Sequence, residues 1–517
     1  MTTNTRSVAM AENRSIHLNL WWVLGGAILL ALLAFLLLFR LGDYPAPWYD
    51  EGSHLHVAKN LAVNGIYADF SSEGLRYYGP AVGVGPTVML PIAGLFRLTD
   101  VSIPLARLVI VAYAFLAIMT LAALGSRITD IRLGIVAAVL LVLTPGAEFV
   151  FNARNVLGEV PGLFFVVAGF WLWFKSGKLS LIRLVGVGTL MGLACITKNQ
   201  YALIVLPSLL LMWIADLVRY RQRGWRYFVI PGVVAGVIFF AWTYVVLIAL
   251  GGGEFSENLT TLREASAGAF FLFGVDEMEK AGRFLTDNGV YGAILIPALL
   301  YGAFLSLRRT EASQRWGMLT IFMLVSTGLF VSSLAWPRYA FPAVAVGSLF
   351  VARLLYDLSN GFQFNIGSLI KREQPPLVTV SMIAAIGLLL TMIVLPVYLH
   401  VSAVRGQGSG DVYTFADYLD QNVPQDALIE TWEQELAVLT DHNYHYPPQI
   451  VLAYSVDETW RDGQPASELY DFRDAVDAAY VVVGPFGKYT ELYPEAYLED
   501  YEIVFSQGSY DLYQFAG

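Results

Sequence analysis

The residues Trp48-Tyr49-Asp50-Glu51-Gly52-Ser53-His54 follow closely on the first long apolar run of the chain, Leu20–Phe39. Two adjacent carboxylates therefore lie beside aromatic side chains at a membrane surface, and Gly52 allows another backbone to approach closely. A pair of acids at a membrane interface is costly to desolvate and usually has a function. The same residue types also occur as solvated loop acids, with an aspartate capping a helix. The rest of the sequence has to decide between these interpretations.

The composition is that of a membrane protein with many spans. Of the 517 residues, 56% are hydrophobic and 14% are charged, and the mean hydropathy is +0.57. Several apolar runs exceed the length of about 18 residues that a bilayer requires. The run Leu20–Phe39 is too long for a signal-peptide core, and no small-residue cleavage site follows it. We therefore expect it to be retained as the first span.

Charge divides the chain near His400. Residues 401–517 contain 21 Asp and Glu against 4 Lys and Arg, a net charge of −17; because the whole chain carries −10, residues 1–400 carry +7. We predict a membrane domain over residues 1–400 and a soluble domain over residues 401–517. So acidic a tail is not expected to bind nucleic acid. The single cysteine, Cys195, excludes a disulfide within the chain and a cysteine-based metal site.

Eleven apolar segments are predicted to span the membrane. They are Leu20–Phe39, Leu105–Ser126, Gly134–Val150, Gly158–Phe174, Leu181–Ile196, Tyr201–Leu217, Tyr227–Leu250, Val290–Leu307, Trp316–Leu334, Tyr339–Tyr356 and Leu377–Leu399. A further apolar stretch, Val82–Leu98, is rich in glycine and proline, which membrane helices tolerate, so its composition does not exclude a crossing. The charges of the loops are more informative.

If Val82–Leu98 does not cross, nearly every cationic cluster of the loops falls on one face of the membrane, as the positive-inside rule requires. These cations are Arg127, Arg132, Lys175, Lys178, Arg183, Arg219, Arg221, Arg223, Arg226, Arg308, Arg309, Arg315, Arg353, Lys371 and Arg372. We therefore predict that Val82–Leu98 is interfacial or re-entrant. The protein is expected in the plasma membrane, with a cytoplasmic N-terminus and an extracytoplasmic tail.

The tail is predicted to be a small α/β domain. Asp411–Gln421 has a helical pattern, Ala427–Thr431 and Ala479–Val483 have strand patterns, and Tyr501–Phe505 and Tyr510–Phe515 flank Gly508 as a hairpin. The fold class is thus an α-helical polytopic membrane protein with a C-terminal extracytoplasmic α/β domain. His442 and His445 near Asp441 have the residue types of a metal site, and an exposed polar turn before two prolines is the alternative.

The predicted topology gathers acids and cations on the outer face. Nucleotide sugars are not supplied there, so a sugar transferase would need a lipid-phosphate donor. Such a transfer requires a carboxylate to take the proton of the acceptor, cations to stabilise the departing phosphate, and an apolar groove for the lipid. Asp50, beside Glu51, supplies the first, and Glu159 is a second outer acid that can orient the acceptor or hold nearby cations. The candidate phosphate-binding cations are Arg76, Lys198, Arg263 and Arg338.

Each of these residues also has a structural interpretation. Arg338 can extend its head group to the interface, Arg263 can be a solvated loop charge, and Glu159 can be an acid in a first helical turn before a proline. Lys198 lies in so short a turn that it must remain near hydrocarbon. If the segment after Trp48 is helical, Asp50 and His54 share a face while His56 points away. A divalent metal at Asp50 and His54 is an alternative to a metal-free site.

Taken in order, these segments resemble the GT-C fold glycosyltransferases that use lipid-linked sugars, most closely the protein O-mannosyltransferase and lipid A aminoarabinose transferase families. The similarity extends over most of residues 40–360. The matching segments are Tyr49-Asp50-Glu51 with the helix His54–Asn64, Arg107-Leu108, Thr144-Pro145, Leu157–Pro161, Gly192–Lys198 and Pro337–Pro342.

The resemblance implies a polyprenyl- or dolichyl-phosphate sugar donor, inversion at the anomeric carbon and no required metal. It implies that Asp50 is the catalytic acid of the first loop, Glu159 the second outer acid and Arg263 a phosphate-binding residue. Where aminoarabinose transferases carry Lys before Pro, this chain has Gly79, and Arg76 is the candidate substitute. We expect an inverting glycosyltransferase that acts on a protein, lipid or glycan acceptor. The rival hypotheses are an oligosaccharyl or lipid-to-lipid transferase and a polyprenyl-lipid transporter without transferase activity.

Overall fold

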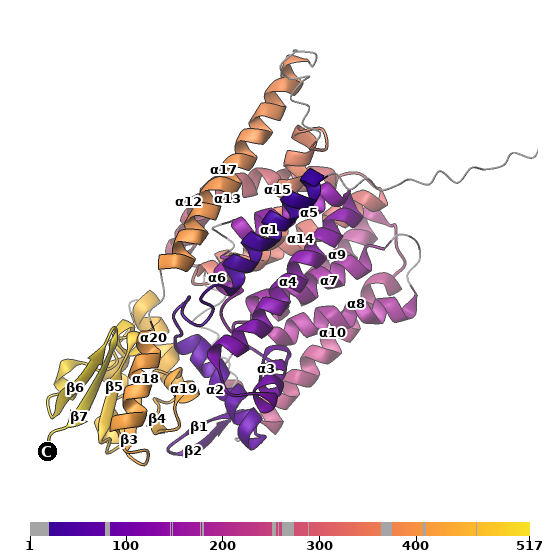
Figure 1. Ribbon diagram of the computed structural model, residues 1–517. Helices are drawn as coiled ribbons and strands as arrows, with labels where there is room; N and C mark the ends of the chain where they lie inside the picture. Colours follow the sequence, from indigo (N-terminus) through magenta and orange to yellow (C-terminus); the bar gives the residue numbers. More distant parts are fainter. Residues whose placement is uncertain are drawn as a thin grey trace, which may run out of the picture.

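A computed structural model of the chain shows a bundle of helices with a small mixed α/β unit at one end (Figure 1). It describes residues 20–77, 83–144, 146, 148–175, 177, 180–250, 255–256, 258–260, 273–287, 289–362, 375–406, 410–461 and 463–517. The predicted site residue Arg263, and Gly79 with the proline that follows it, lie outside these residues.

Each of the eleven expected spans coincides with an apolar helix. The helices are α1 (Leu20–Leu38), α4 (Ile103–Ile128), α5 (Ile131–Leu143), α7 (Glu159–Trp173), α8 (Leu181–Thr197), α9 (Asn199–Ala215) with η2 (Asp216–Tyr220), α10 (Arg226–Tyr244) with η3 (Val245–Ala249), α13 (Gly289–Leu305), α14 (Glu311–Val331), α15 (Pro337–Leu358) and α17 (Pro376–Gly406). Among the described residues, six helical stretches are long and apolar enough to cross a membrane by themselves, and shorter apolar helices accompany them. The chain is thus a multi-pass membrane protein.

The predicted end of the third span was wrong. Helix α5 stops at Leu143 rather than near Val150, and the short helix α6 (Phe149–Asn152) follows after a break. Thr144 has extended backbone angles because a proline comes next, and a residue before proline is disfavoured in the helical region.

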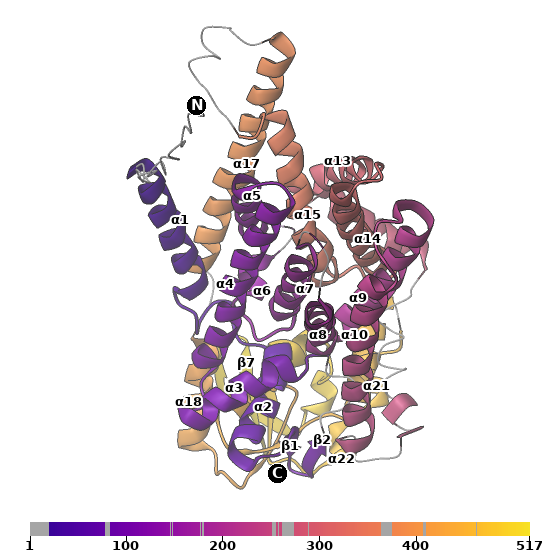
Figure 2. The ribbon, with the colours of Figure 1, turned by 90° about the vertical axis from the view of Figure 1, so that its right-hand side faces the viewer.

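The cationic loops gather at one end of the bundle. Arg132 donates to the Gly361 carbonyl, Arg353 to Thr129, and Arg219 to the Leu307 carbonyl, so loops far apart in sequence meet there. The α/β unit and helix α2 (Tyr49–Asn64) lie at the opposite end (Figures 1 and 2). The arrangement has the one-sided distribution of positive charge that the sequence predicted.

Helix α3 (Pro86–Leu98), from the ambiguous stretch, does not traverse the bundle. The segment before it pairs with the end of α8, where Gly85 donates to the Thr197 carbonyl at 3.0 Å. The chain after it enters α4, whose Arg107 contacts Glu51 of α2. Both ends of α3 therefore lie at the same end of the bundle, and its 13 residues would reach only about 20 Å, less than a bilayer core.

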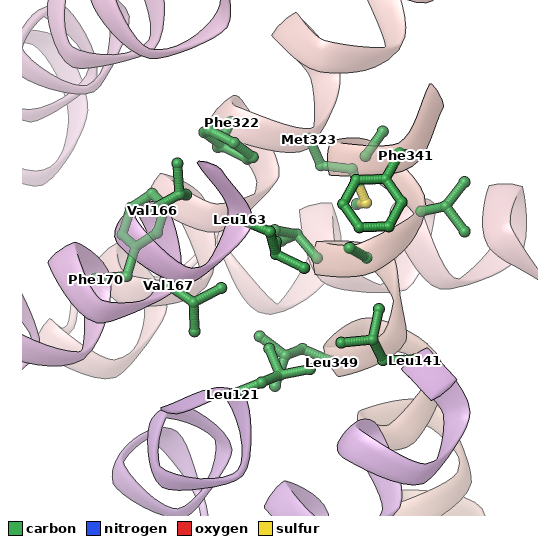
Figure 3. Close-up of a cluster of buried hydrophobic side chains, with 14 of the residues drawn as sticks. Leu121, Leu141, Leu163, Val166, Val167, Phe170, Phe322, Met323, Phe341 and Leu349 are labelled. Carbon is green, nitrogen blue, oxygen red and sulfur yellow. The ribbon is translucent and has the colours of Figure 1, made fainter. Parts of the chain in front are cut away.

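A close-packed apolar core holds the helices together. Figure 3 shows side chains of α4, α5, α7, α14 and α15 meeting in one cluster, with Leu163 and Phe341 near its middle. Both side chains are fully buried. Small residues allow the closest approaches: a Cβ on Gly162 would lie 2.1 Å from the ring of Tyr201. This packing fixes the tail-side ends of α7, α9 and α15, at which Glu159, Lys198 and Arg338 lie.

The tail forms the expected sheet. Its strands are β3 (Leu428–Thr431), β4 (Asn443–His445), β5 (Tyr480–Val483), β6 (Tyr501–Gln507) and β7 (Tyr510–Phe515), in the order β4-β3-β5-β7-β6. β3 runs parallel to β4 and β5, and β7 is antiparallel to β5 and β6. Around the sheet lie α18 (Asp411–Asn422), α19 (Leu436–Leu439), α20 (Ile450–Arg461), α21 (Ala466–Leu469), α22 (Phe472–Ala475), α23 (Pro485–Tyr489) and η4 (Glu495–Tyr497).

Two further elements lie among the described residues. The hairpin of β1 (Ala68–Ser71) and β2 (Gly74–Tyr77) follows α2 and meets the tail, since Ser72 donates to the Tyr444 carbonyl at 2.7 Å. Helix α12 (Val275–Asp287) precedes α13.

Candidate active site

Asp50 lies in the first turn of α2 and contacts the start of α15. Arg338 Nη1 donates to Asp50 Oδ2 at 2.5 Å, and both side chains keep about a quarter of their surface exposed, 25% for Asp50 and 27% for Arg338. Burial raises the pKa of the Asp50 carboxyl, but Arg338, through its charge and hydrogen bond, together with the charges of His54 and Lys198, brings the pKa below its ordinary value. Asp50 is thus an ionised carboxylate that remains accessible.

A second acid–cation pair lies at the junction of α8 and α9. Lys198 separates the two helices, and its ammonium contacts Glu159 Oε1, at the start of α7. Glu159 is fully buried, whereas the Lys198 side chain is 11% exposed. A residue larger than glycine cannot replace Gly158, because a Cβ there would lie 2.8 Å from Lys198 Cβ. Because Glu159 is buried and Lys198 is partly exposed, Glu159 positions Lys198 and is not itself exposed to the cavity.

Asp50, Lys198 and Arg338 line one large cavity of about 1020 Å³. Its membrane-side wall consists of apolar residues of α9, α10 and η3, including Leu203, Trp242 and Val246. Its other wall comes from the tail, through α20, α23 and the end of β3. The cavity thus has charged groups in its middle, an apolar side toward the bundle and a roof of tail residues.

Glu51, predicted as a catalytic residue beside Asp50, lies in the protein interior and not at the cavity. Its side chain is fully buried, does not line the cavity, and takes two hydrogen bonds from Arg107, from Nε at 2.8 Å and from Nη2 at 2.5 Å. The backbone N–H of Val156 donates to Glu51 at 3.0 Å. Glu51 therefore anchors α2 to α4 and to the chain before α7. Arg107, quoted in the sequence only as part of a matching segment, is its partner.

Arg76 lies on β2 and also lines the cavity, with its guanidinium already engaged. It donates to Asp69 at 2.7 Å and to the Pro447 carbonyl at 3.4 Å, and it stacks over the Tyr446 ring at 4.8 Å. These contacts link the hairpin to the tail. Arg76 is thus at the cavity, as predicted, but bound to protein groups.

The two histidines of α2 point to different neighbours. His54 lines the cavity and its Nδ1 donates to the Val156 carbonyl at 2.8 Å, whereas His56 faces Gln434 of the tail at 3.2 Å. Within the described residues no group of three or more His, Cys, Asp or Glu could hold a metal ion. In the tail, the His445 ring contacts the Glu430 carboxylate.

The tail is part of the site, which the division at residue 400 did not predict. Gly52 packs directly on the tail backbone, since an added Cβ would lie 2.2 Å from the Glu435 nitrogen. Lys59 donates to the Ala437 and Thr440 carbonyls at 2.8 and 2.9 Å. The close approach expected at Gly52 occurs, and its partner is the tail.

This arrangement of helices is shared with solved structures. Over 95% of the chain, the structure is similar to ArnT from Cupriavidus metallidurans, an aminoarabinose transferase solved alone and bound to undecaprenyl phosphate, with a TM-score of 0.61, 16% identity and 97% of that chain covered. It is also similar to the oligosaccharyltransferase AglB of Archaeoglobus fulgidus, with a TM-score of 0.58, 13% identity and 74% of that chain covered. The chain has the GT-C fold.

The GT-C fold assigned from the sequence is therefore confirmed, although no protein-family model and no curated protein sequence matches the chain. AglB has also been solved with an inhibitory peptide and a dolichol-phosphate. At this level of identity the likeness establishes the fold, and the chemistry has to be argued from the residues of this chain.

Proposed function

We propose that the protein is an inverting glycosyltransferase that moves a sugar from a polyprenyl-phosphate donor to an acceptor hydroxyl at the outer membrane face. The observation that carries the proposal is the joint position of Asp50, Arg338 and Lys198 in one cavity, between an apolar membrane-side wall and the tail. A carboxylate, two cations and an apolar groove are the three requirements of this transfer. The fold, shared with proteins solved with polyprenyl phosphates, supports the same reaction class.

In the proposed reaction Asp50 is the general base. The acceptor oxygen attacks the anomeric carbon, its proton passes to Asp50, and the bond from the anomeric carbon to the phosphate oxygen breaks. Polyprenyl phosphate leaves with the electron pair, and Lys198 and Arg338 stabilise its added charge. A single displacement of this kind inverts the anomeric centre. No metal is required in this scheme.

The Asp50–Arg338 contact gives the donor a second role. A donor phosphate beside Lys198 competes with Asp50 for the Arg338 guanidinium. As Arg338 turns toward the phosphate, Asp50 loses the cation that lowers its pKa and becomes a stronger base. Donor binding would therefore activate the base before an acceptor is deprotonated.

The reaction can be tested in detergent, without a second compartment. Purified protein is mixed with a radiolabelled polyprenyl-phosphate sugar, and transfer or release of the sugar is followed. A transferase turns over in detergent, and Asp50→Asn stops it; a transporter releases no sugar under any condition. Turnover that is absent with every donor tried, while the donors bind, would favour the transporter.

The orientation can be tested separately. We propose that the tail is extracytoplasmic and that the cationic loops are cytoplasmic. In a Cys195→Ser background, single cysteines replace the exposed residues Ser509 in the tail and Gln222 after η2. An impermeant thiol reagent on intact cells should label the first and not the second, and the reverse pattern would overturn the orientation.

A further inference from the structure

Two tail carboxylates next to α2 have no role in the reaction above. Glu433 and Glu435 lie in the segment Trp432–Glu435 between β3 and α19, and both are fully buried. Neither forms an ion pair with Lys, Arg or His in the described part of the chain. Ionised carboxylates buried without a cation are costly, so other groups must stabilise this pair.

Glu433 holds a loop of the tail through the backbone. Its Oε1 accepts N–H bonds from Gly484 at 3.1 Å and Gly487 at 2.8 Å, and its Oε2 accepts one from Phe486 at 3.3 Å. A side chain on Gly484 has no space, because its Cβ would lie 2.6 Å from the Glu433 carboxyl carbon. Glu433 thus fixes the start of α23 and the direction of the Phe486 ring.

That ring packs on the residue next to the proposed base. Phe486 stacks on Tyr49 with ring centroids 4.0 Å apart and planes 13° from parallel, and Trp432 contacts both rings at 4.8 and 5.9 Å. Tyr49 directly precedes Asp50 at the start of α2. One turn further, Gly52 abuts the backbone of Glu435. The segment Trp432–Glu435 therefore contacts the first turn of α2 at two places, Tyr49 and Gly52.

The two carboxyl groups also interact electrostatically with each other. Glu435 Oε1 accepts from the Tyr510 hydroxyl at 2.7 Å, while its buried Oε2 has no donor in the described residues. Burial raises the pKa of Glu433 to about 7, although the three N–H groups lower it. Burial, and then the charge of Glu433, raise the pKa of Glu435 well above its ordinary value. A proton on Glu435 would give Glu433 one more donor.

The other described ionisable groups around the pair are hydroxyls and His56, whose ring contacts Gln434 and whose pKa burial lowers to about 4. Tyr510 of β7 contacts Glu435, Tyr444 and Tyr446 lie near it, and Tyr493 lies near Glu433. Burial raises the pKa of all four phenols, so they stay neutral near pH 7. Lys488, on α23, pairs with Asp511 instead. The carboxyl pair is therefore the group here that titrates in the physiological range.

We propose that Glu433 and Glu435 share one proton and that this carboxyl pair positions Asp50, through Phe486 and Tyr49, so that transfer depends on the protonation of the tail. With one proton, Glu435 donates and ionised Glu433 accepts all three backbone N–H groups. A second proton removes an acceptor lone pair from Glu433 and loosens the loop. Loss of the shared proton leaves two adjacent buried charges. The inference rests on the proposed function in that Asp50 is the base.

The test is the pH dependence of transfer at saturating donor for wild type, Glu433→Gln, Glu435→Gln and Phe486→Leu. Wild-type activity should fall below about pH 7, and Glu433→Gln, which leaves Asp50 in place, separates this limb from a titration of Asp50. Glu433→Gln should lower kcat by about ten- to a hundredfold, as expected for a displaced base, and remove the limb. Phe486→Leu, which uncouples the loop from Tyr49, should remove the limb too. Binding of bare undecaprenyl phosphate should be unchanged.

Two variants serve as controls. Glu435→Gln still offers a donor to Glu433, so its kcat at pH 7 should stay near that of wild type. Glu430→Gln changes another buried carboxylate of the same sheet, bonded to His445, Tyr470 and Tyr493 rather than to the backbone N–H groups of Gly484–Gly487, and should keep the limb near pH 7. If Glu433→Gln retains both the wild-type rate and the limb, the inference is wrong. Wild-type turnover by Asp50→Asn would instead overturn the proposed function.

A second measurement does not depend on activity or on the folding of variants. Hydrogen exchange of the wild-type protein is followed from pH 5 to pH 9, after correction for the intrinsic rate. The amides of Gly484–Tyr489 and of Tyr49–Gly52 should lose protection together as the pH falls below about 7. Protection that is constant across this range, or that changes in one segment alone, would contradict a shared positioning role.

Discussion

The two faces of helix α2 carry neighbouring acids with opposite environments. Glu51 points into the bundle, where Arg107 donates one hydrogen bond to each of its carboxylate oxygens. Both side chains are fully buried. Asp50 points toward the cavity, where it and Arg338 keep about a quarter of their side-chain surface exposed. The same residue types in adjacent positions thus form a sealed anchor and an accessible ion pair. An acid–arginine pair is informative about chemistry only when its burial and access are known.

The largest expected effect comes from opening the sealed pair. Glu51→Gln leaves Arg107 as an unpaired buried charge, which should lower the free energy of unfolding by about 3–5 kcal/mol. The matched control is Glu279→Gln on α12, where the partner Arg283 is 71% exposed and the change should cost well under about 1 kcal/mol. Unfolding midpoints in detergent measure both. Equal midpoints for the two variants would remove the distinction between the faces.

On the cavity side the measurement is donor use by the folded fraction, because Lys198→Ala also leaves the buried Glu159 without its cation. Lys198→Ala removes a charge-assisted contact to the donor phosphate, worth about 1.5–3 kcal/mol, or ten- to a hundredfold in the donor concentration needed. Arg97→Ala, an exposed cation at the end of α3 that does not line the cavity, is the control and should not change it. If both variants respond to donor like wild type, Lys198 does not bind the phosphate.

The contact of α2 with the tail can be tested at glycine. A methyl group at Gly52 meets the Glu435 backbone, so Gly52→Ala should destabilise the protein by about 1–3 kcal/mol through overpacking. Gly94→Ala in α3, which has no atom within 4 Å of the added group, should be neutral or stabilising by about 0.5–1 kcal/mol. Equal stability of the two variants would mean that the tail does not pack on α2.

The smallest effect is a shift in pH dependence. Because the pKa of Asp50 is lowered, its side chain stays ionised over the pH range in which an ordinary aspartate takes up a proton. It is protonated only as the pH falls through the lowered pKa. Arg338→Gln removes the main cause of the lowering and should move this acid limb of kcat/KM to higher pH. The limb is measured in a Glu433→Gln background, which lacks the limb near pH 7. An unmoved limb would mean that Asp50 is not the titrating base.

Much of this architecture could be predicted because the membrane imposes it. Apolar runs predicted the apolar helices, one-sided cations favoured a segment at α3 that does not traverse the bundle, and alternating patterns predicted β3, β5 and the hairpin of β6 and β7. The role of Glu51 could not be read, because a helix turns about 100° per residue and the sequence does not say which of two adjacent acids faces Arg107. The charge step near His400 marked the tail but not its contact with α2. Only Gly52 indicated that contact.

The most direct test of the account compares Asp50→Asn with Glu51→Gln in one assay of sugar transfer from a purified polyprenyl-phosphate donor, with rates normalised to folded protein. Asp50→Asn should unfold like wild type and lose about 10²–10⁴ in rate, as expected when a general base is removed. Glu51→Gln should unfold early, while its folded fraction turns over within about tenfold of wild type. Two results would contradict the assignment of chemistry to the accessible face. One is turnover by Asp50→Asn at the wild-type rate, and the other is a rate loss in folded Glu51→Gln that exceeds the loss in Asp50→Asn.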